Sequence, residues 1–137
     1  MYILGINAYH GDSSACILYN GEIIAASEEE RFRRIKHWAG FPSEAIKFCL
    51  GEANIDITQV SYITISRDPS ANLHKKIVHS VKNLVSVRAL KDRLANSKKV
   101  VSTKAELAKI FNVYEDDIKA EVKNVEHHRS HLDSAFF

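Results

Sequence analysis

The sequence predicts an α/β domain built on a mixed sheet of about five strands with flanking helices. Two features of the pattern indicate this fold class. Asn20-Gly21 separates two apolar, β-prone runs, and this pair favours the type I′ turn of an antiparallel hairpin. A helical pattern then separates the hairpin from a later β-prone run, and strand–helix–strand order implies a crossover to parallel pairing. The five runs lie at residues 2–6, 15–19, 22–27, 60–65 and 121–126.

The composition is that of one globular domain. The chain has 137 residues, of which 45% are apolar and 26% are charged, and its net charge is +2. A chain of this length can bury a core of its own. No apolar run approaches the roughly 20 residues of a membrane helix, and the first residues lack the basic leader of a signal peptide. We therefore expect no membrane partner. Because Cys16 and Cys49 lack the density of a secreted disulfide scaffold, we expect a reducing compartment and a cytoplasmic protein.

Three helical segments are predicted beside the sheet. The first runs from residue 43 or 44 to about 53, with Ser43 as its cap and with Gly51 as a residue that can end it early. A long helical pattern covers 71–97 and a shorter one covers 103–111. The outer face of 71–97 is basic but lacks interleaved aromatic residues, so we expect a solvated face and no nucleic-acid partner. The buried stripe of the first helix is expected at Ala45, Ile46, Cys49, Leu50 and Ala53.

The loop between the first two strands is the first candidate site. It contains His10, Gly11, Asp12, Ser13 and Ser14. Because sheet is expected at both ends of this loop, one ligand can meet its side chains and its backbone together. A polar turn without a function is the alternative interpretation.

A dense run of charge follows the hairpin, with three acids at 28–30 and four bases at 31–36. One interpretation is a solvated turn whose charges pair with one another. The other is that bases such as Arg31 and Lys36 reach over the polar loop and hold a phosphate-bearing substrate, because guanidinium groups match phosphate oxygens.

Histidines near the end of the sequence form the second candidate site. His127 and His131 are four residues apart, so on a helix both imidazoles project from one face, as two ligands of one metal ion require. The alternative is a helix start with packed or solvated histidines. An apolar helical stripe begins at Leu132 and is very short, so we expect the natural protein to continue and to supply a further metal ligand.

Several segments carry a resemblance to a known family: 5–7, 10–14, 26–32, 36–37, 41–42 and 125–137. Together they resemble the N-terminal domain of the O-carbamoyltransferases, the enzymes of nodulation-factor, cephamycin and aminoglycoside-type carbamoylation. The resemblance covers the whole chain. Its most specific parts are the run Glu-Glu-Glu-Arg-Phe at 28–32 and the histidine-containing run at 127–137.

The resemblance implies an actin-like, ribonuclease-H-like ATPase subdomain, of which residues 1–137 are a truncated N-terminal part. It implies that a second domain of the same full-length chain makes carbamoyl-adenylate from ATP and carbamoyl phosphate. The actin-like domain then transfers the carbamoyl group to a hydroxyl of a small-molecule acceptor. A divalent transition metal, taken as iron(II), is held in the family by His127, His131 and a downstream aspartate. The isolated fragment is expected to be inactive.

Within that reaction the loop residues receive expected roles. An alcohol needs a base at neutral pH, and the imidazole of His10 suits that role. Asp12 is expected to orient His10 or the acceptor hydroxyl. The groups expected to contact phosphate, ribose or substrate are Gly11, Ser13, Ser14, Arg31 and Lys36.

Two other functions fit part of the pattern. An actin-fold sugar kinase or ATPase would bind ATP phosphates and Mg²⁺ through Asp12, but it would not need the paired histidines. A non-enzymatic module would bind nucleic acid through the basic helical face.

Overall fold

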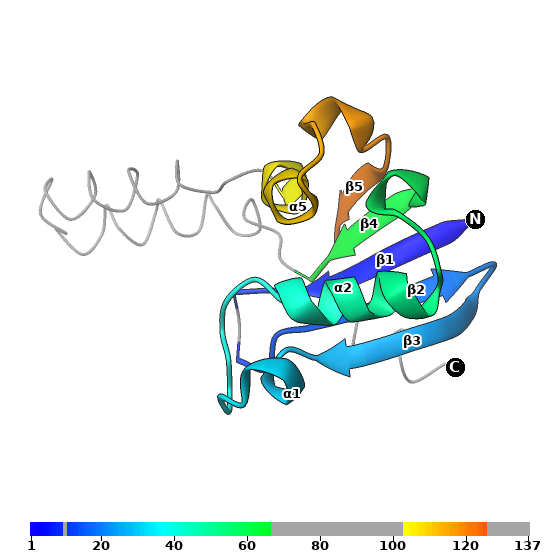
Figure 1. Cartoon of the computed structure of the whole chain (residues 1–137). Coiled ribbons are helices and arrows are strands. Elements are labelled where there is room, and N and C mark those ends of the chain that lie inside the picture. The colour runs from blue at the N-terminus through cyan, green and yellow to red at the C-terminus, as the bar shows by residue number, and fades with distance from the viewer. Residues whose placement is uncertain (10, 67–102, 126–137) are drawn as a thin grey trace, which may run out of the picture.

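The computed structural model describes residues 1–9, 11–66 and 103–125. Four predictions lie outside these residues: the base at His10, the long helical pattern at 71–97, the pair His127 and His131, and the apolar stripe that begins at Leu132. The described part is a sheet with helices packed against it (Figure 1).

One five-stranded sheet, in the order β3-β2-β1-β4-β5, forms the centre of the molecule. β1 (Tyr2–Asn7), β2 (Ser14–Tyr19) and β3 (Glu22–Glu28) are antiparallel neighbours. β4 (Tyr62–Ile65) and β5 (Glu121–Asn124) continue the sheet parallel to β1. The chain forms three antiparallel strands first, and then a helix and further strands. This is the order expected from the resemblance to the actin-like fold. The predicted fold class is therefore confirmed.

The β2–β3 hairpin forms for the predicted reason. Asn20 and Gly21 have φ angles of 52° and 93°, and a type I′ turn requires positive φ at both positions. Further along the hairpin the register shifts, because Ile17 pairs with Ala25 while Leu18 pairs with Ile23. The residue between Ala25 and Ile23 is thus the extra residue of a β-bulge on β3, which increases the local twist.

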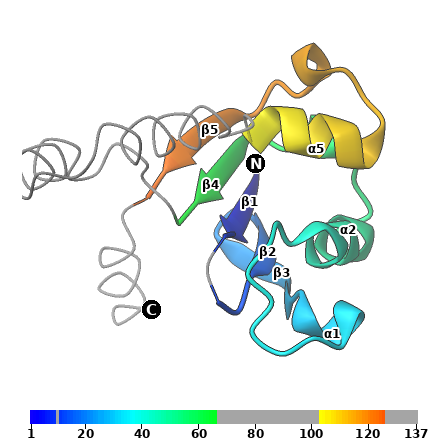
Figure 2. The same ribbon diagram turned by 90° about the vertical axis from the view of Figure 1, so that its left-hand side faces the viewer.

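Helices cover one face of the sheet and build the core there. α2 (Ser43–Glu52) and α5 (Thr103–Phe111) lie on the same side of the sheet (Figure 2). The predicted stripe of α2 is confirmed, with four of its residues buried and Ala53 partly buried. Burial of this apolar surface is the main source of stability. The largest contributions come from Leu4, Ile17, Ile46, Ile57, Ile63, Leu107 and Ile118.

Two details of α2 differ from the prediction. The helix begins at Ser43 itself, with Pro42 at the N-cap position and no capping bond from that side chain. Ser43 is therefore not the cap, and another element supplies it, as described below. Gly51 does not end the helix, which continues to Glu52. The cost of a helical glycine, about 1 kcal/mol, is outweighed by the burial of Cys49 and Leu50 in the same turn.

Short elements complete the described chain. The charge run after the hairpin forms a short helix, α1 (Glu30–Arg33), and single turns of 3₁₀ helix occur at Ile57–Gln59 and Glu115–Asp117. On the outer strand β5, Lys123 forms an ion pair with Glu121. In the described ranges no helix combines the length and apolar character that crossing a bilayer demands.

Candidate active site

An open groove of about 580 Å³ lies where β1, β4 and β5 end. Asn7 at the end of β1, Ser66 after β4 and Val125 after β5 all line it. Ser14 and Arg31 line it from β2 and α1. In open α/β sheets, ligands bind outside the carboxyl ends of the strands. The groove is therefore the first candidate for a binding site in the described chain.

Small side chains form the floor of this groove. Gly5 pairs with Cys16 on one side and Thr64 on the other, and Cys16 pairs with Ala26. All four residues line the groove. A Cβ atom on Gly5 would lie only 2.7 Å from Cys16 Sγ, so the floor requires glycine here. Burial raises the pKa of the Cys16 thiol, which keeps this part of the floor uncharged near neutral pH.

The loop between β1 and β2 holds a strained backbone beside the groove. Tyr9 and Asp12 have φ angles of 60° and 66°, and such left-handed conformations cost a non-glycine residue about 1–3 kcal/mol. Bonds from neighbouring elements hold this conformation in place. The Tyr9 N–H donates to the Gly40 carbonyl at 3.2 Å, and Asn7 Nδ2 donates to the Asp12 carbonyl at 3.2 Å. Strain of this kind concentrates at functional sites.

Helix α5 supports the same loop. The Tyr9 hydroxyl donates to the carboxylate of Glu106 on α5, and the Tyr9 and Phe41 rings lie 6.1 Å apart. Partial burial raises the pKa of the Glu106 carboxyl. The loop is thus fixed from α5 on one side and from the segment after α1 on the other.

The two predicted serines lie in different surroundings. Ser13 is fully buried, its Oγ donates to the Gly40 carbonyl at 2.7 Å, and its N–H donates to the Trp38 carbonyl at 3.1 Å. This hydroxyl therefore fastens the loop to the segment at 38–40, and its contact with substrate remains a prediction. Ser14 is half-buried and lines the groove.

Asp12 has a partner that the sequence analysis did not assign. Its Oδ1 lies 2.8 Å from Nδ1 of His37, a residue 25 positions later in the chain. The hydrogen bond and charge of Asp12 raise the pKa of His37, and the charge of Glu30 raises it further. The described carboxylate therefore points to His37. Its predicted relation to His10 lies outside the described residues.

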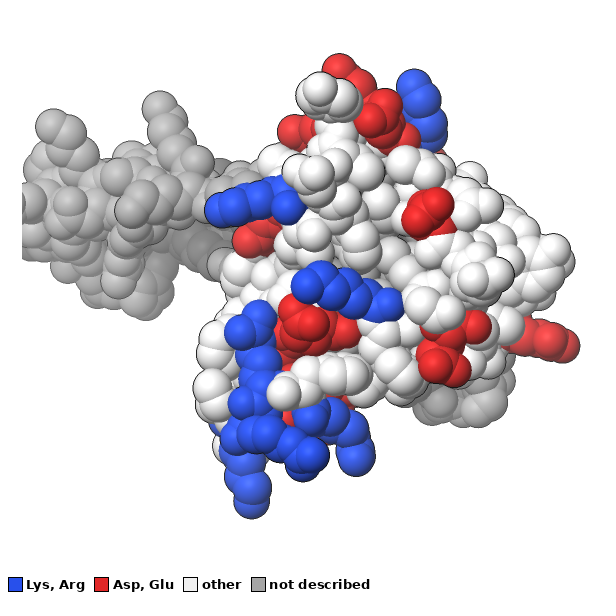
Figure 3. Space-filling model, viewed as in Figure 1, with Lys and Arg blue, Asp and Glu red and all other residues white. Residues whose placement is uncertain are grey.

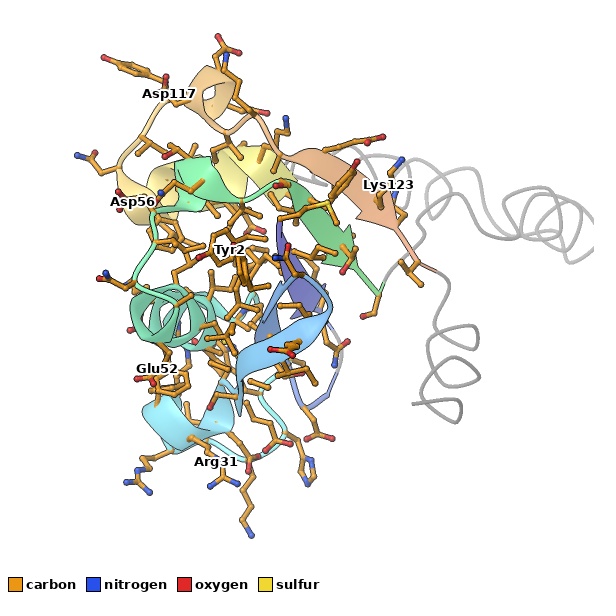
Figure 4. The ribbon with its side chains drawn as sticks, turned by 90° about the vertical axis from the view of Figure 1, so that its right-hand side faces the viewer. Tyr2, Arg31, Glu52, Asp56, Asp117 and Lys123 are labelled. Atoms are coloured by element: carbon orange, nitrogen blue, oxygen red, sulfur yellow. The ribbon has the colours of Figure 1, made fainter. Side chains whose placement is uncertain are left out.

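Basic side chains gather over α1 and the segment after it (Figure 3). Arg31 projects from α1 (Figure 4) and lines the groove, whereas Lys36 is exposed outside the lining. Neither forms an ion pair with another residue of the described ranges. Arg33 does, with Glu29. The self-paired turn therefore holds for Arg33, whereas Arg31 has no carboxylate partner among the residues that the structure describes.

Glu29 is a structural carboxylate that the sequence did not predict. It is fully buried, and it accepts from Arg33 Nε at 2.6 Å and from the Ala45 N–H at 2.8 Å. It thereby caps the N-terminus of α2 from another element, where a carboxylate is favoured. The Arg33 guanidinium also lies 4.5 Å from the centre of the Trp38 ring. The carboxylate thus joins α1 to α2, and through Arg33 it is linked to the segment that supports the loop.

No sequence pattern separates Glu29 from its two acidic neighbours. It lies just after β3 with helical backbone angles (φ −62°, ψ −30°), so the alternation of strand side chains does not extend to it. Its burial follows from its contacts with Arg33 and with the N-terminus of α2, which is distant in sequence.

The described ranges contain no cluster of three side chains able to hold a metal ion. His127 and His131 lie outside them, so the metal site remains a prediction.

The fold is that of an α/β domain with an open groove at the carboxyl ends of β1, β4 and β5. Its sequence matches the family model described as carbamoyltransferase N-terminus over residues 2–137, so the chain belongs to that family. The predicted family is confirmed.

The chain is similar to part of two much longer proteins. It is 38% identical to uncharacterized protein sll1178 of Synechocystis sp. (strain ATCC 27184 / PCC 6803 / Kazusa), over 99% of this chain and 23% of that protein. It is 29% identical to nodulation protein NolNO of Sinorhizobium fredii (strain NBRC 101917 / NGR234), over 95% of this chain and 18% of that protein. The chain therefore spans about a quarter or less of these relatives. Among solved structures, YeaZ from Pseudomonas aeruginosa is similar with a TM-score of 0.48 and 13% identity, over 98% of this chain and 50% of that chain.

Proposed function

We propose that this chain is the N-terminal part of an O-carbamoyltransferase that passes a carbamoyl group to a hydroxyl of a small-molecule acceptor. The observation that carries the proposal is the family match over residues 2–137. In the full-length enzyme, the donor is carbamoyl-adenylate made from ATP and carbamoyl phosphate by a second domain.

The transfer step assigns roles to residues at one edge of the sheet. The acceptor oxygen bonds to the carbamoyl carbon, the bond from that carbon to the AMP phosphate oxygen breaks, and His10 takes the hydroxyl proton as general base. Arg31 binds the departing phosphate, with help from Ser14 and the Gly11 amide. Support for this arrangement is that Arg31 and Ser14 line the same groove. Lys36 is a further phosphate contact of the proposed site.

A divalent metal, with iron(II) as the expected ion, completes the proposed site. His127 and His131 would hold it, and two imidazoles suit such an ion. When bound, it would supply Lewis acidity toward the carbamoyl donor. Support comes from Val125, which lines the groove two residues before His127. Two residues of chain reach at most about 7 Å.

The test uses the full-length protein with ATP, carbamoyl phosphate and a panel of sugar, aminoglycoside and other hydroxyl acceptors. We expect pyrophosphate release that depends on carbamoyl phosphate, followed by AMP release and a carbamate ester on one acceptor. ADP and a phosphorylated acceptor without carbamoyl phosphate would instead identify a kinase. The His10→Asn variant is expected to keep pyrophosphate release and lose the transfer. Equal loss of both steps would contradict the role of His10.

A further inference from the structure

We propose that His37 is a positioning residue, which holds the Asp12 carboxylate in one orientation at the site. This inference rests on the proposed function and on the role expected for Asp12 in it, which is to orient His10 or the acceptor hydroxyl. The contact that carries it is the 2.8 Å hydrogen bond between His37 Nδ1 and Asp12 Oδ1.

Both partners have a fixed backbone. Asp12 and His37 have φ angles of 66° and 55°, each in the left-handed region. Asn7 holds the Asp12 carbonyl, and Glu30 accepts from the His37 N–H at 3.4 Å. Because the backbones of both residues are held in place, the Asp12 carboxylate can change its position only by rotating about its side-chain bonds. The hydrogen bond from the His37 imidazole restricts that rotation.

The pair continues a series of bonds between two loops. Immediately after Asp12, the Ser13 N–H donates to the carbonyl of Trp38, the residue immediately after His37. The Ser13 hydroxyl then donates to Gly40. The loop after β1 and the segment after α1 are thus aligned residue by residue, and Asp12–His37 is the side-chain contact at one end of that alignment.

The solvent exposure of the two side chains indicates that their contact affects the transfer rate more than stability. The side chains of His37 and Asp12 are 79% and 56% exposed, and exposed pairs contribute little to stability. An exposed pair between two strained backbones can still select one rotamer. We therefore expect His37 to affect the transfer rate much more than the unfolding free energy.

Charge makes this positioning dependent on pH. The groups that face His37 are the carboxylates of Asp12 and Glu30, and both raise its pKa. The imidazolium–carboxylate bond is complete below the ordinary histidine pKa, and it weakens as pH rises through the raised pKa of His37. Above that pH a neutral hydrogen bond remains.

Two substitutions of one residue separate positioning from catalysis. In His37→Asn, the side-chain amide places a donor near the Nδ1 position, and asparagine tolerates positive φ. In His37→Ala the donor is lost. We expect the alanine variant of the full-length enzyme to lower kcat of transfer about 10- to 100-fold, with pyrophosphate release unchanged. The asparagine variant should recover most of kcat and lose the decline with rising pH.

The matched control is Lys47→Ala, which breaks an exposed ion pair with Glu44 on α2 at 2.9 Å, and it should leave transfer unchanged. The pKa of His37, measured by NMR on the 137-residue chain, should fall in Asp12→Asn. Equal inactivity of both His37 variants would mean a direct catalytic role and would overturn the proposal. Unchanged transfer in His37→Ala would also overturn it. Absence of transfer in the wild-type enzyme contradicts the proposed function instead, and the NMR result then still decides whether the pair exists.

Discussion

Replacing Glu29 by alanine should destabilise the domain more than any neighbouring charge substitution. The change removes the fully buried carboxylate that accepts from Arg33 and from the Ala45 N–H. Loss of one partner of a buried pair costs about 3–5 kcal/mol. Because the side chain of Arg33 is 35% exposed and can turn to water, we expect the lower end, about 3 kcal/mol. The Ala45 N–H is buried and accounts for about 1–3 kcal/mol of this as an unsatisfied donor.

Urea unfolding of the chain followed by circular dichroism measures the effect. For a domain of this size, about 3 kcal/mol also lowers Tm by roughly 10 °C. The matched control is Glu28→Gln on the preceding, exposed residue, which should change the unfolding free energy by less than about 0.5 kcal/mol. A loss in Glu29→Ala no larger than in this control would refute the assignment of Glu29 as the cap of α2.

Three further outcomes are expected. Gly5→Ala should destabilise the domain by about 1–3 kcal/mol, since its Cβ would lie 2.7 Å from Cys16 Sγ, and adding Cys16→Ala should recover most of the loss in urea unfolding. Cys49 should resist a thiol reagent until the chain unfolds, because it is fully buried and its pKa is raised to about 11; rapid labelling of native Cys16→Ala protein would contradict this. The raised pKa of Glu106 means that the folded state holds its proton more tightly, so stability should fall as pH rises from the ordinary glutamate pKa through the raised one. Glu106→Gln should flatten this slope in a urea series across pH, and a slope unchanged from wild type would exclude Glu106 as its source.

The fold could be predicted from local sequence patterns because its main features, a hairpin turn and the buried face of a helix, are each set by residues close together in the sequence. Asn20-Gly21 sets the hairpin through two adjacent backbone angles, and the α2 stripe is set by helical spacing within one segment. The cap of α2 was predicted wrongly for the opposite reason. Ser43 is adjacent in sequence, but Glu29 reaches the helix from 15 and 16 positions away, where it meets Glu44 and Ala45.

The roles of the candidate site residues stay predictions, and the structure adds contacts that the sequence did not predict. Ser14 and Arg31 both line one groove, although they come from different elements. The partner of Asp12 could not be predicted, because His37 is 25 residues away and both lie in loops without periodicity. Charge alone also made three consecutive carboxylates look alike, whereas burial makes only Glu29 structural.

The two outer strands of the described sheet are unequally protected against pairing with another molecule. β5 has four residues and carries an ion pair between Glu121 and Lys123, and short, charged edges resist such pairing. β3 has seven residues, and its Ile23 and Ile24 side chains are 69% and 44% exposed. Only its bulge and the glutamates at its two ends interrupt the row of backbone N–H and C=O groups along its outer edge in the described sheet. Of the two outer strands that the structure describes, β3 should therefore be the one that pairs with another molecule in concentrated solution, and Ile23→Lys should suppress this pairing.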